Sequence, residues 1–86
     1  SLSIKGNDKL EEVDALDSLE KIGRDLDISD HISLTDVTGL HNVTAVGRNF
    51  SVETNTALKT SDAEALRDAI GTSNIGGSVT IKDNKP

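Results

Sequence analysis

The chain has 86 residues, enough for one small domain, and carries 15 Asp and Glu residues against 9 Lys and Arg residues, for a formal net charge of −6. An excess of negative charge repels polyanions, so the composition argues against nucleic-acid binding. The absence of cysteine excludes disulfides, cysteine nucleophiles and thiolate metal sites. No apolar run is long enough for a membrane-spanning helix, so we predict no membrane span.

The pattern of apolar residues repeats after 24 residues. The first copy contains Leu2, Ile4, Leu10, Val13, Leu16, Leu19, Ile22 and Gly23, and the second contains Leu26, Ile28, Leu34, Val37, Leu40, Val43, Val46 and Gly47. A repeat of this length cannot bury its apolar face alone, so neighbouring copies must stack. We therefore predict one solenoid domain over residues 1–86, with repeats at 1–24, 25–48 and 49–77 and a partial repeat at 78–86.

Each copy opens with apolar and polar residues in alternation, as in Leu2, Ser3, Ile4 and Lys5. This period of two predicts short half-buried strands at residues 2–5, 26–29, 50–53 and 78–82. Because each connection returns the chain in the same direction, the strands should pair in parallel and in order. The inward-facing Leu26, Ile28, Leu34 and Leu40 should be buried, since their copy has a neighbour on both sides.

Three further features mark the rest of each copy. Apolar residues spaced three apart, from Leu10 to Ile22, predict tight turns or short 3₁₀ pieces. The glycines Gly23 and Gly47 should turn the chain into the next strand, a role that Gly76 and Gly77 take before the fourth. A polar residue also follows each strand, and we expect these four to form an inward ladder that satisfies backbone groups: Asn7, His31, Asn55 and Asn84.

The third copy is longer, and its added residues predict a helix over residues 62–70. Ser61 and Glu64 have the spacing of a capping box at the N-terminus. Gly71 suits the position after the helix, where a left-handed residue is common. The expected apolar stripe consists of Ala65, Leu66, Ala69 and Ile70.

Several segments, "SLEKIGRDLDIS", "NVTAVGRNFSVE" and "LRDAIGTSNIGGSVTIKDN", resemble the leucine-rich receptor L-domain, closest to its bacterial secreted and cell-surface members. The shared pattern Leu-x-x-Ile-Gly-x-x-Leu-x-Ile-x-x-Asn runs from Leu19 to His31, with His31 in the Asn position. The resemblance covers nearly the whole chain. It implies an α/β repeat fold, a right-handed leucine-rich-repeat-like β-solenoid, that binds proteins or surfaces and has no catalytic motif. The chain departs from the family in His31, in lacking a cysteine cap and in beginning on a strand.

The exposed strand face is the candidate binding surface, and its residues are Lys5, Asp25, Asp27, Ser29, Glu53, Thr80 and Lys82. It lacks the aromatic and arginine anchors that usually dominate binding energy, so it should bind weakly or through avidity. Asp25, Asp27 and Asp30 allow a calcium interpretation, and His31 with His41 a zinc interpretation. Neither has the ligand spacing of a known site, so we predict no metal, no cofactor and no catalytic residues.

The sequence therefore predicts a non-catalytic recognition or adhesion module, extracellular or at a cell surface, that is a fragment or the C-terminal part of a longer protein. Its expected partner is a protein or cell-surface ligand. The alternative is a structural spacer with no specific ligand. A chain that starts on a strand at Leu2 leaves one coil uncovered. Uncovered strand edges invite pairing, so either the first coil self-associates or a preceding segment of a longer protein caps it.

Overall fold

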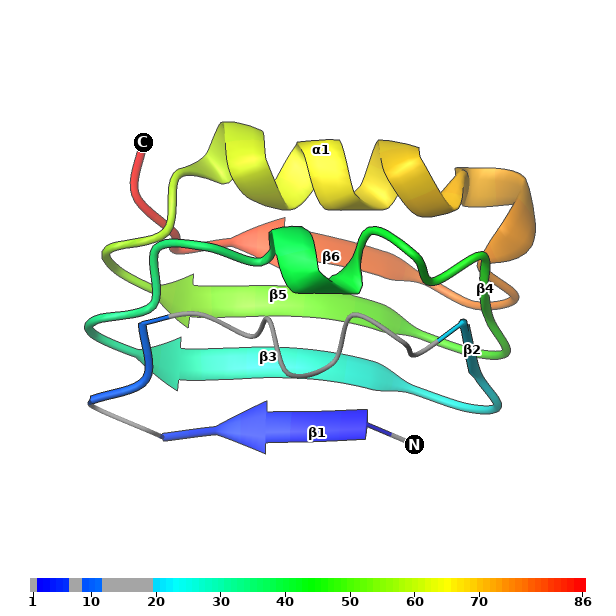
Figure 1. Cartoon of the computed structure of the whole chain (residues 1–86), viewed down its shortest axis with the longest axis horizontal. Helices are drawn as coiled ribbons and strands as arrows, with labels where there is room; N and C mark the ends of the chain where they lie inside the picture. Colours follow the sequence, from blue (N-terminus) through cyan, green and yellow to red (C-terminus); the bar gives the residue numbers. More distant parts are fainter. Residues whose placement is uncertain (1, 7–8, 12–19) are drawn as a thin grey trace.

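A computed structural model describes residues 2–6, 9–11 and 20–86. Its main element is a four-stranded parallel sheet, in which the strands lie side by side in the order β1 (Leu2–Lys5), β3 (Leu26–His31), β5 (Phe50–Asn55) and β6 (Val79–Lys82) (Figure 1). The predicted strands, their parallel pairing and their order are confirmed. Strands β3 and β5 run two residues further than predicted, as far as the ladder positions.

The repeat in the sequence sets the register of the sheet. Leu2 lies opposite Leu26, and Leu26 lies opposite Phe50, so equivalent residues of successive copies are partners. In β6 the partner of Phe50 is Val79, because the third copy is longer. This register places apolar residues of all four strands on one face. The predicted burial of Leu26 and Ile28 is confirmed, since both are 0% exposed.

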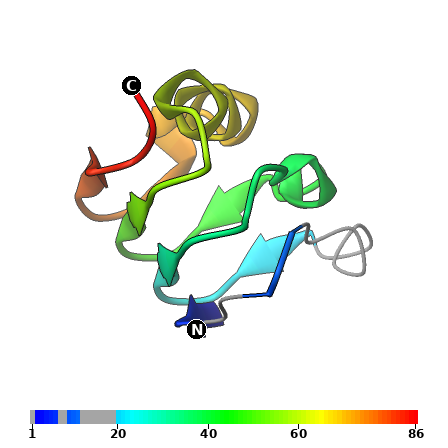
Figure 2. The same ribbon diagram turned by 90° about the vertical axis from the view of Figure 1, so that its left-hand side faces the viewer.

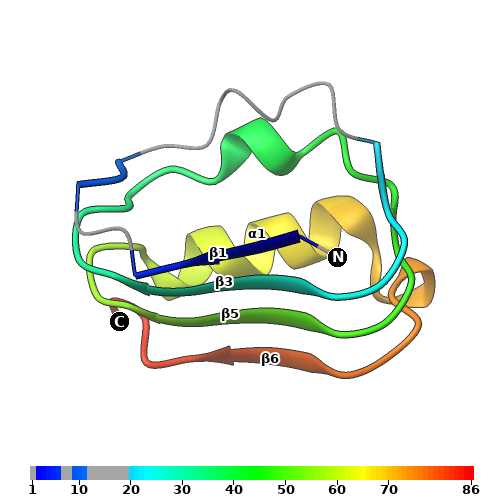
Figure 3. The same cartoon turned by 90° about the horizontal axis from the view of Figure 1, so that it is seen from below.

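A second, smaller parallel sheet joins β2 (Lys21–Ile22) to β4 (Ala45–Val46), and an isolated bridge adds Ile75 beside Val46. Neither strand was predicted, because two-residue strands leave no period-two pattern. The 3₁₀-helix η2 (Thr38–Leu40) agrees with the tight turns expected in the second copy, whereas residues 12–19 of the first copy lie outside the described residues. Figure 3 shows η2 on the opposite side of the molecule from β3, β5 and β6.

Helix α1 (Thr60–Ile70) begins two residues before the predicted helix. The predicted capping box is wrong: Lys59 is the N-cap residue, and no side chain caps the helix. Instead, the amide and the hydroxyl of Thr60 donate to the backbone oxygen of Lys85, at 2.7 Å and 3.0 Å. This tertiary contact moves the start of the helix, so Ser61 falls inside the first turn. Gly71 ends the helix with φ +89°, and a second 3₁₀-helix, η3 (Thr72–Asn74), follows.

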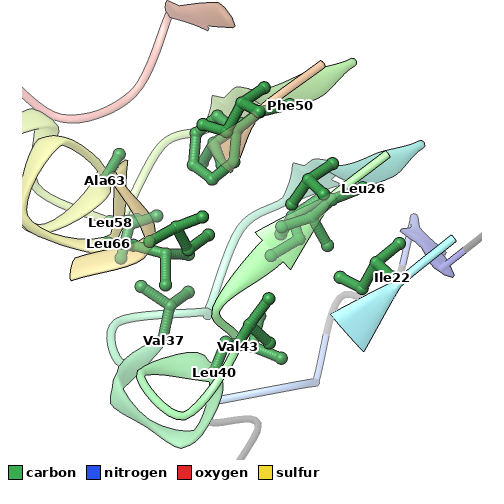
Figure 4. Packing of buried hydrophobic residues seen from close by; sticks show 14 of the residues in the cluster. Ile22, Leu26, Val37, Leu40, Val43, Phe50, Leu58, Ala63 and Leu66 are labelled. Atoms are coloured by element: carbon green, nitrogen blue, oxygen red, sulfur yellow. The ribbon is translucent and has the colours of Figure 1, made fainter. Parts of the chain in front are cut away.

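The core lies between the sheets and the helical side of the molecule (Figures 2 and 4). Helix α1 contributes Ala63, Leu66 and Ile70, which are spaced three and four apart. The predicted stripe is therefore wrong for Ala65 and Ala69, which are exposed. The described core consists of Ile22, Leu26, Ile28, Leu34, Val37, Leu40, Val43, Val46, Phe50, Val52, Leu58, Ala63, Leu66, Ile70 and Ile75.

Each copy contains a residue with a left-handed backbone conformation, directly after the strand in β1 and β6 and at the next-to-last residue of the strand in β3 and β5. These residues are Gly6, Asp30, Thr54 and Asp83, with φ values of 62°, 63°, 55° and 57°. Each directly precedes a ladder position. The sequence did not predict this turn, because the four positions share no residue type. Gly6 and the two aspartates adopt a left-handed conformation readily, but Thr54 is β-branched and does so rarely.

Gly23 and Gly47 lie at bends just before β3 and β5, as predicted, and Gly47 and Gly76 have a further role in packing. Neither Gly47 nor Gly76 has a left-handed φ, and both lie where two backbones approach closely. A Cβ atom on Gly47 would lie 2.2 Å from the carbonyl oxygen of Gly23, and one on Gly76 would lie 2.3 Å from that of Gly47. These glycines therefore allow successive turns of the chain to stack.

Candidate functional site

The outer face of the four-stranded sheet carries the polar residues that alternate with the buried ones. The register aligns them in two rows across the strands. One row contains Ser3, Asp27, Ser51 and Thr80, and the other contains Lys5, Ser29, Glu53 and Lys82. The predicted binding residues on the strands therefore lie together on one face.

Charge on this face follows the order of the strands. Lys5 on β1 and Lys82 on β6 lie at the two edges, and Asp27 on β3 and Glu53 on β5 lie between them. Lys5 Nζ is 3.2 Å from Asp27 Oδ2, and Lys82 Nζ is 3.9 Å from Glu53 Oε2. The lysine side chains are 59% and 61% exposed, and the carboxylates 29% and 31%. The result is a band of charge in the order positive, negative, negative, positive.

Residues with hydroxyl groups share these two rows with the charged residues. Ser51 Oγ donates to Glu53 Oε1 at 2.7 Å, which holds the carboxylate over the sheet beside Lys82. Ser29 lies in the same row between Lys5 and Glu53, and Thr80 lies opposite Ser51. The face can therefore both donate and accept hydrogen bonds along its length.

Asp25 lies just before β3, and its carboxylate accepts a hydrogen bond from the next copy of the repeat. Its Oδ1 accepts from the backbone N–H of Asn49 at 3.2 Å, and Asn49 Oδ1 in turn accepts from the N–H of Ser78 at 2.9 Å. These two contacts link successive copies at the start of each strand. Their sequence signal is a side chain with an acceptor oxygen at equivalent positions of two copies, Asp25 and Asn49, 24 residues apart.

At the far end of the strands, the ladder residues bond back to the preceding copy. His31 Nε2 lies 2.9 Å from the carbonyl oxygen of Ile4, so this nitrogen carries the proton. Asn55 Nδ2 donates to Ile28 O at 3.0 Å, and Asn84 Nδ2 donates to Val52 O at 2.9 Å. Asn7 lies outside the described residues. His31 therefore occupies the same place as the asparagines and serves the same structural contact.

The contacts of the acidic and histidine residues bear on the two metal interpretations. Asp27 pairs with Lys5, and Asp25 accepts from a backbone amide. His31 is buried, whereas His41 is exposed at the end of η2. Within residues 2–6, 9–11 and 20–86, no three His, Asp or Glu side chains are grouped to hold a metal ion.

A groove of about 320 Å³ lies between the segment around η2 and helix α1. It is lined by Thr35, Asp36, Val37, Thr38, His41, Asp62 and Ala65. The N–H and hydroxyl of Thr38 donate to Asp36 Oδ1 at 2.8 Å and 2.6 Å. The hydroxyl bond and then the amide bond lower the pKa of Asp36, with a smaller contribution from His41. This groove was not predicted, although Asp36-x-Thr38 is a typical local turn pattern.

Comparisons of the chain with protein-family models, curated proteins and solved structures find no match. In the part of the chain that the structure describes, no helix is long and apolar enough to cross a membrane. The function must therefore be inferred from the geometry of the outer face and the groove.

Proposed function

We propose that the chain is part of a leucine-rich-repeat-like solenoid similar to receptor L-domains, and that it is a non-catalytic recognition or adhesion module of a secreted or cell-surface protein. The constant register between copies supports the repeat architecture. The side-chain contacts at both ends of the strands support it too, because each copy bonds to the next in the same way.

The observation that carries the recognition role is the charge band on the outer face. Two carboxylates on the central strands are flanked by lysines on the edge strands, with serine and threonine hydroxyls between them. Exposed ion pairs of this kind contribute only about 0–1 kcal/mol each, so both partners can be exchanged for groups of a ligand at little cost. A complementary partner presents basic groups at its centre and acidic groups at its margins.

The strength of binding follows from the same residues. Without a buried aromatic or arginine anchor, a single copy should bind weakly. Several copies displayed together gain affinity through their effective concentration, commonly by about 10²-fold or more. An adhesion role, in which many copies act together, therefore suits this surface.

The test is a binding screen of the chain, displayed in many copies on beads, against purified extracellular proteins, glycans and cell surfaces. Glu53→Lys should abolish saturable binding, because it reverses the centre of the charge band. Glu64→Lys is the matched control: it makes the same charge change on the exposed face of α1 and should leave binding intact. A chain with no saturable partner, or with equal loss in both variants, would favour the spacer role.

A further inference from the structure

The β1 edge of the sheet is open on its outer side. β1 is the terminal strand of the described sheet, with β3 as its neighbour. Leu2 and Ile4 point to the core side but are only partly buried, whereas their partners Leu26 and Ile28 are 0% exposed. The inward-facing apolar side chains of β1 are therefore more exposed to solvent than the equivalent side chains of β3.

The backbone of β1 shows the same asymmetry. The amides of Leu2 and Gly6 donate to Asp25 O and Ser29 O, at 2.9 Å and 3.1 Å. In a parallel ladder, alternate residues bond to opposite neighbours, so the amides of Ser3 and Lys5 point away from β3. They are placed to donate to another strand running in the same direction as β1.

Gly23 indicates what kind of segment fits at the open edge of β1. Gly47 and Gly76 must be glycine because each approaches the carbonyl of the equivalent glycine one turn earlier. Gly23 has no such neighbour: a Cβ atom there would meet nothing within 4 Å, and its φ is not left-handed. Within the described structure, neither packing nor backbone conformation explains this glycine. One more turn of chain, stacked on Gly23 as Gly23 is stacked on Gly47, would explain it.

The opposite end of the sheet is built differently. Helix α1 lies beyond β6 at that end, in contact with it, whereas β1 is the outermost element at the other end (Figure 1). The two ends of the molecule are therefore not equivalent. A second copy cannot present a matching open turn at its helical end without displacing α1.

We propose that the β1 end is a docking surface for one further turn of the same repeat, which runs parallel to β1 and places its backbone against Gly23. This inference rests on the proposed stacking of repeats but not on the recognition role. The occupant is a repeat-like coil with a strand beside β1 and a small residue at the position equivalent to Gly23. A second copy of the chain is the competing occupant.

The test extends the full chain by a copy of its residues 25–48 placed directly before Ser1, with a scrambled version of the same 24 residues as the control. The ordered copy should raise the urea midpoint of unfolding, and the scrambled copy should not. Gly23→Ala should have little effect on the midpoint of the original chain. In the extended chain it should lower the midpoint by as much as Gly47→Ala lowers it in the original chain.

Amide hydrogen exchange gives a second readout that needs no destabilised variant. Ser3 and Lys5 should exchange about 10-fold or more slowly in the extended chain than in the original, while Leu2 and Gly6 are protected in both. The proposal is overturned if Gly23→Ala has the same small effect in both chains, or if Ser3 and Lys5 gain no protection. It is also overturned if the original chain protects these two amides by dimerising, as detected by light scattering.

Discussion

The stacking of glycines predicts that Gly47→Ala and Gly23→Ala have very different effects on stability. The new Cβ atom at position 47 would lie 2.2 Å from the carbonyl oxygen of Gly23, and ordinary contacts begin at 3.4 Å. The new Cβ atom and the carbonyl of Gly23 are both attached to backbone, so neither can move aside as a side chain would. The two segments of chain around Gly23 and Gly47 must therefore separate by more than about 1 Å. Such overpacking costs about 1–3 kcal/mol.

Separation of the two turns also weakens the hydrogen bond from the Gly47 amide to Ile22 O, which is 2.8 Å long. A bond of this kind contributes about 0.5–1.5 kcal/mol. Alanine gains about 0.4–1 kcal/mol by restricting the unfolded chain. The expected net loss is therefore about 0.5–4 kcal/mol, compared with a total stability of about 4–13 kcal/mol expected for a chain of this size.

Position 23 is the matched control. The same substitution there meets nothing within 4 Å, so only the unfolded-state term remains, and stability should be unchanged or rise by up to about 1 kcal/mol. The assay is urea denaturation followed by far-ultraviolet circular dichroism, because the chain has one Phe and no Trp or Tyr. Equal losses at the two positions would refute the stacking of Gly47 on Gly23.

Four further predictions concern other parts of the fold. Leu26→Ala should cost about 2–5 kcal/mol in urea denaturation, because Leu26 is fully buried; a loss below about 1 kcal/mol would mean that the faces of the sheet are reversed. Asn55→Ala should cost about 2 kcal/mol or more in the same assay, since it leaves a buried carbonyl of β3 without this donor; an unchanged midpoint would contradict the ladder. Thr54→Gly should stabilise the protein by up to about 1 kcal/mol by relieving a left-handed β-branched residue, and a destabilised variant would argue against this turn. The pKa of Asp36 is lowered in the folded state by its hydrogen bonds from Thr38. The ionised carboxylate therefore stabilises the fold above the usual aspartate pKa of about 3.9, and this contribution is lost as the pH falls through the lowered value. An NMR titration of Asp36 should show the lowered midpoint, and Thr38→Val should move that midpoint upward.

The strands and their register were predictable because the period-two pattern and the 24-residue repeat agree with each other. Shifting one strand by a single residue would turn Leu26 and Ile28 to the outer face, so the register is strongly specified. The same alternation placed Lys5, Glu53 and Lys82 together on the outer face. Their order across the sheet, with lysines at the edges, follows from the strand order and the repeat.

Features that depend on tertiary contacts were not predictable in this way. The start of α1 is fixed by Lys85, which approaches Thr60 only because the last strand returns beside the third copy. The groove beside Asp36 depends on how α1 lies against the η2 segment. The role of Gly47 could have been inferred from its recurrence at Gly23 and Gly76, but glycine at a bend is more often explained by backbone conformation.

The most direct test of the proposed recognition role is NMR mapping of the outer face with a partner obtained from the binding screen. The account predicts that amide resonances of Ser3, Asp27, Ser51, Glu53 and Thr80 shift in a saturable way as the partner is added. Resonances of residues 35–41 and 60–70 should remain unchanged. Shifts confined to the groove around Asp36, His41 and Asp62 would contradict the claim that the sheet face is the binding surface.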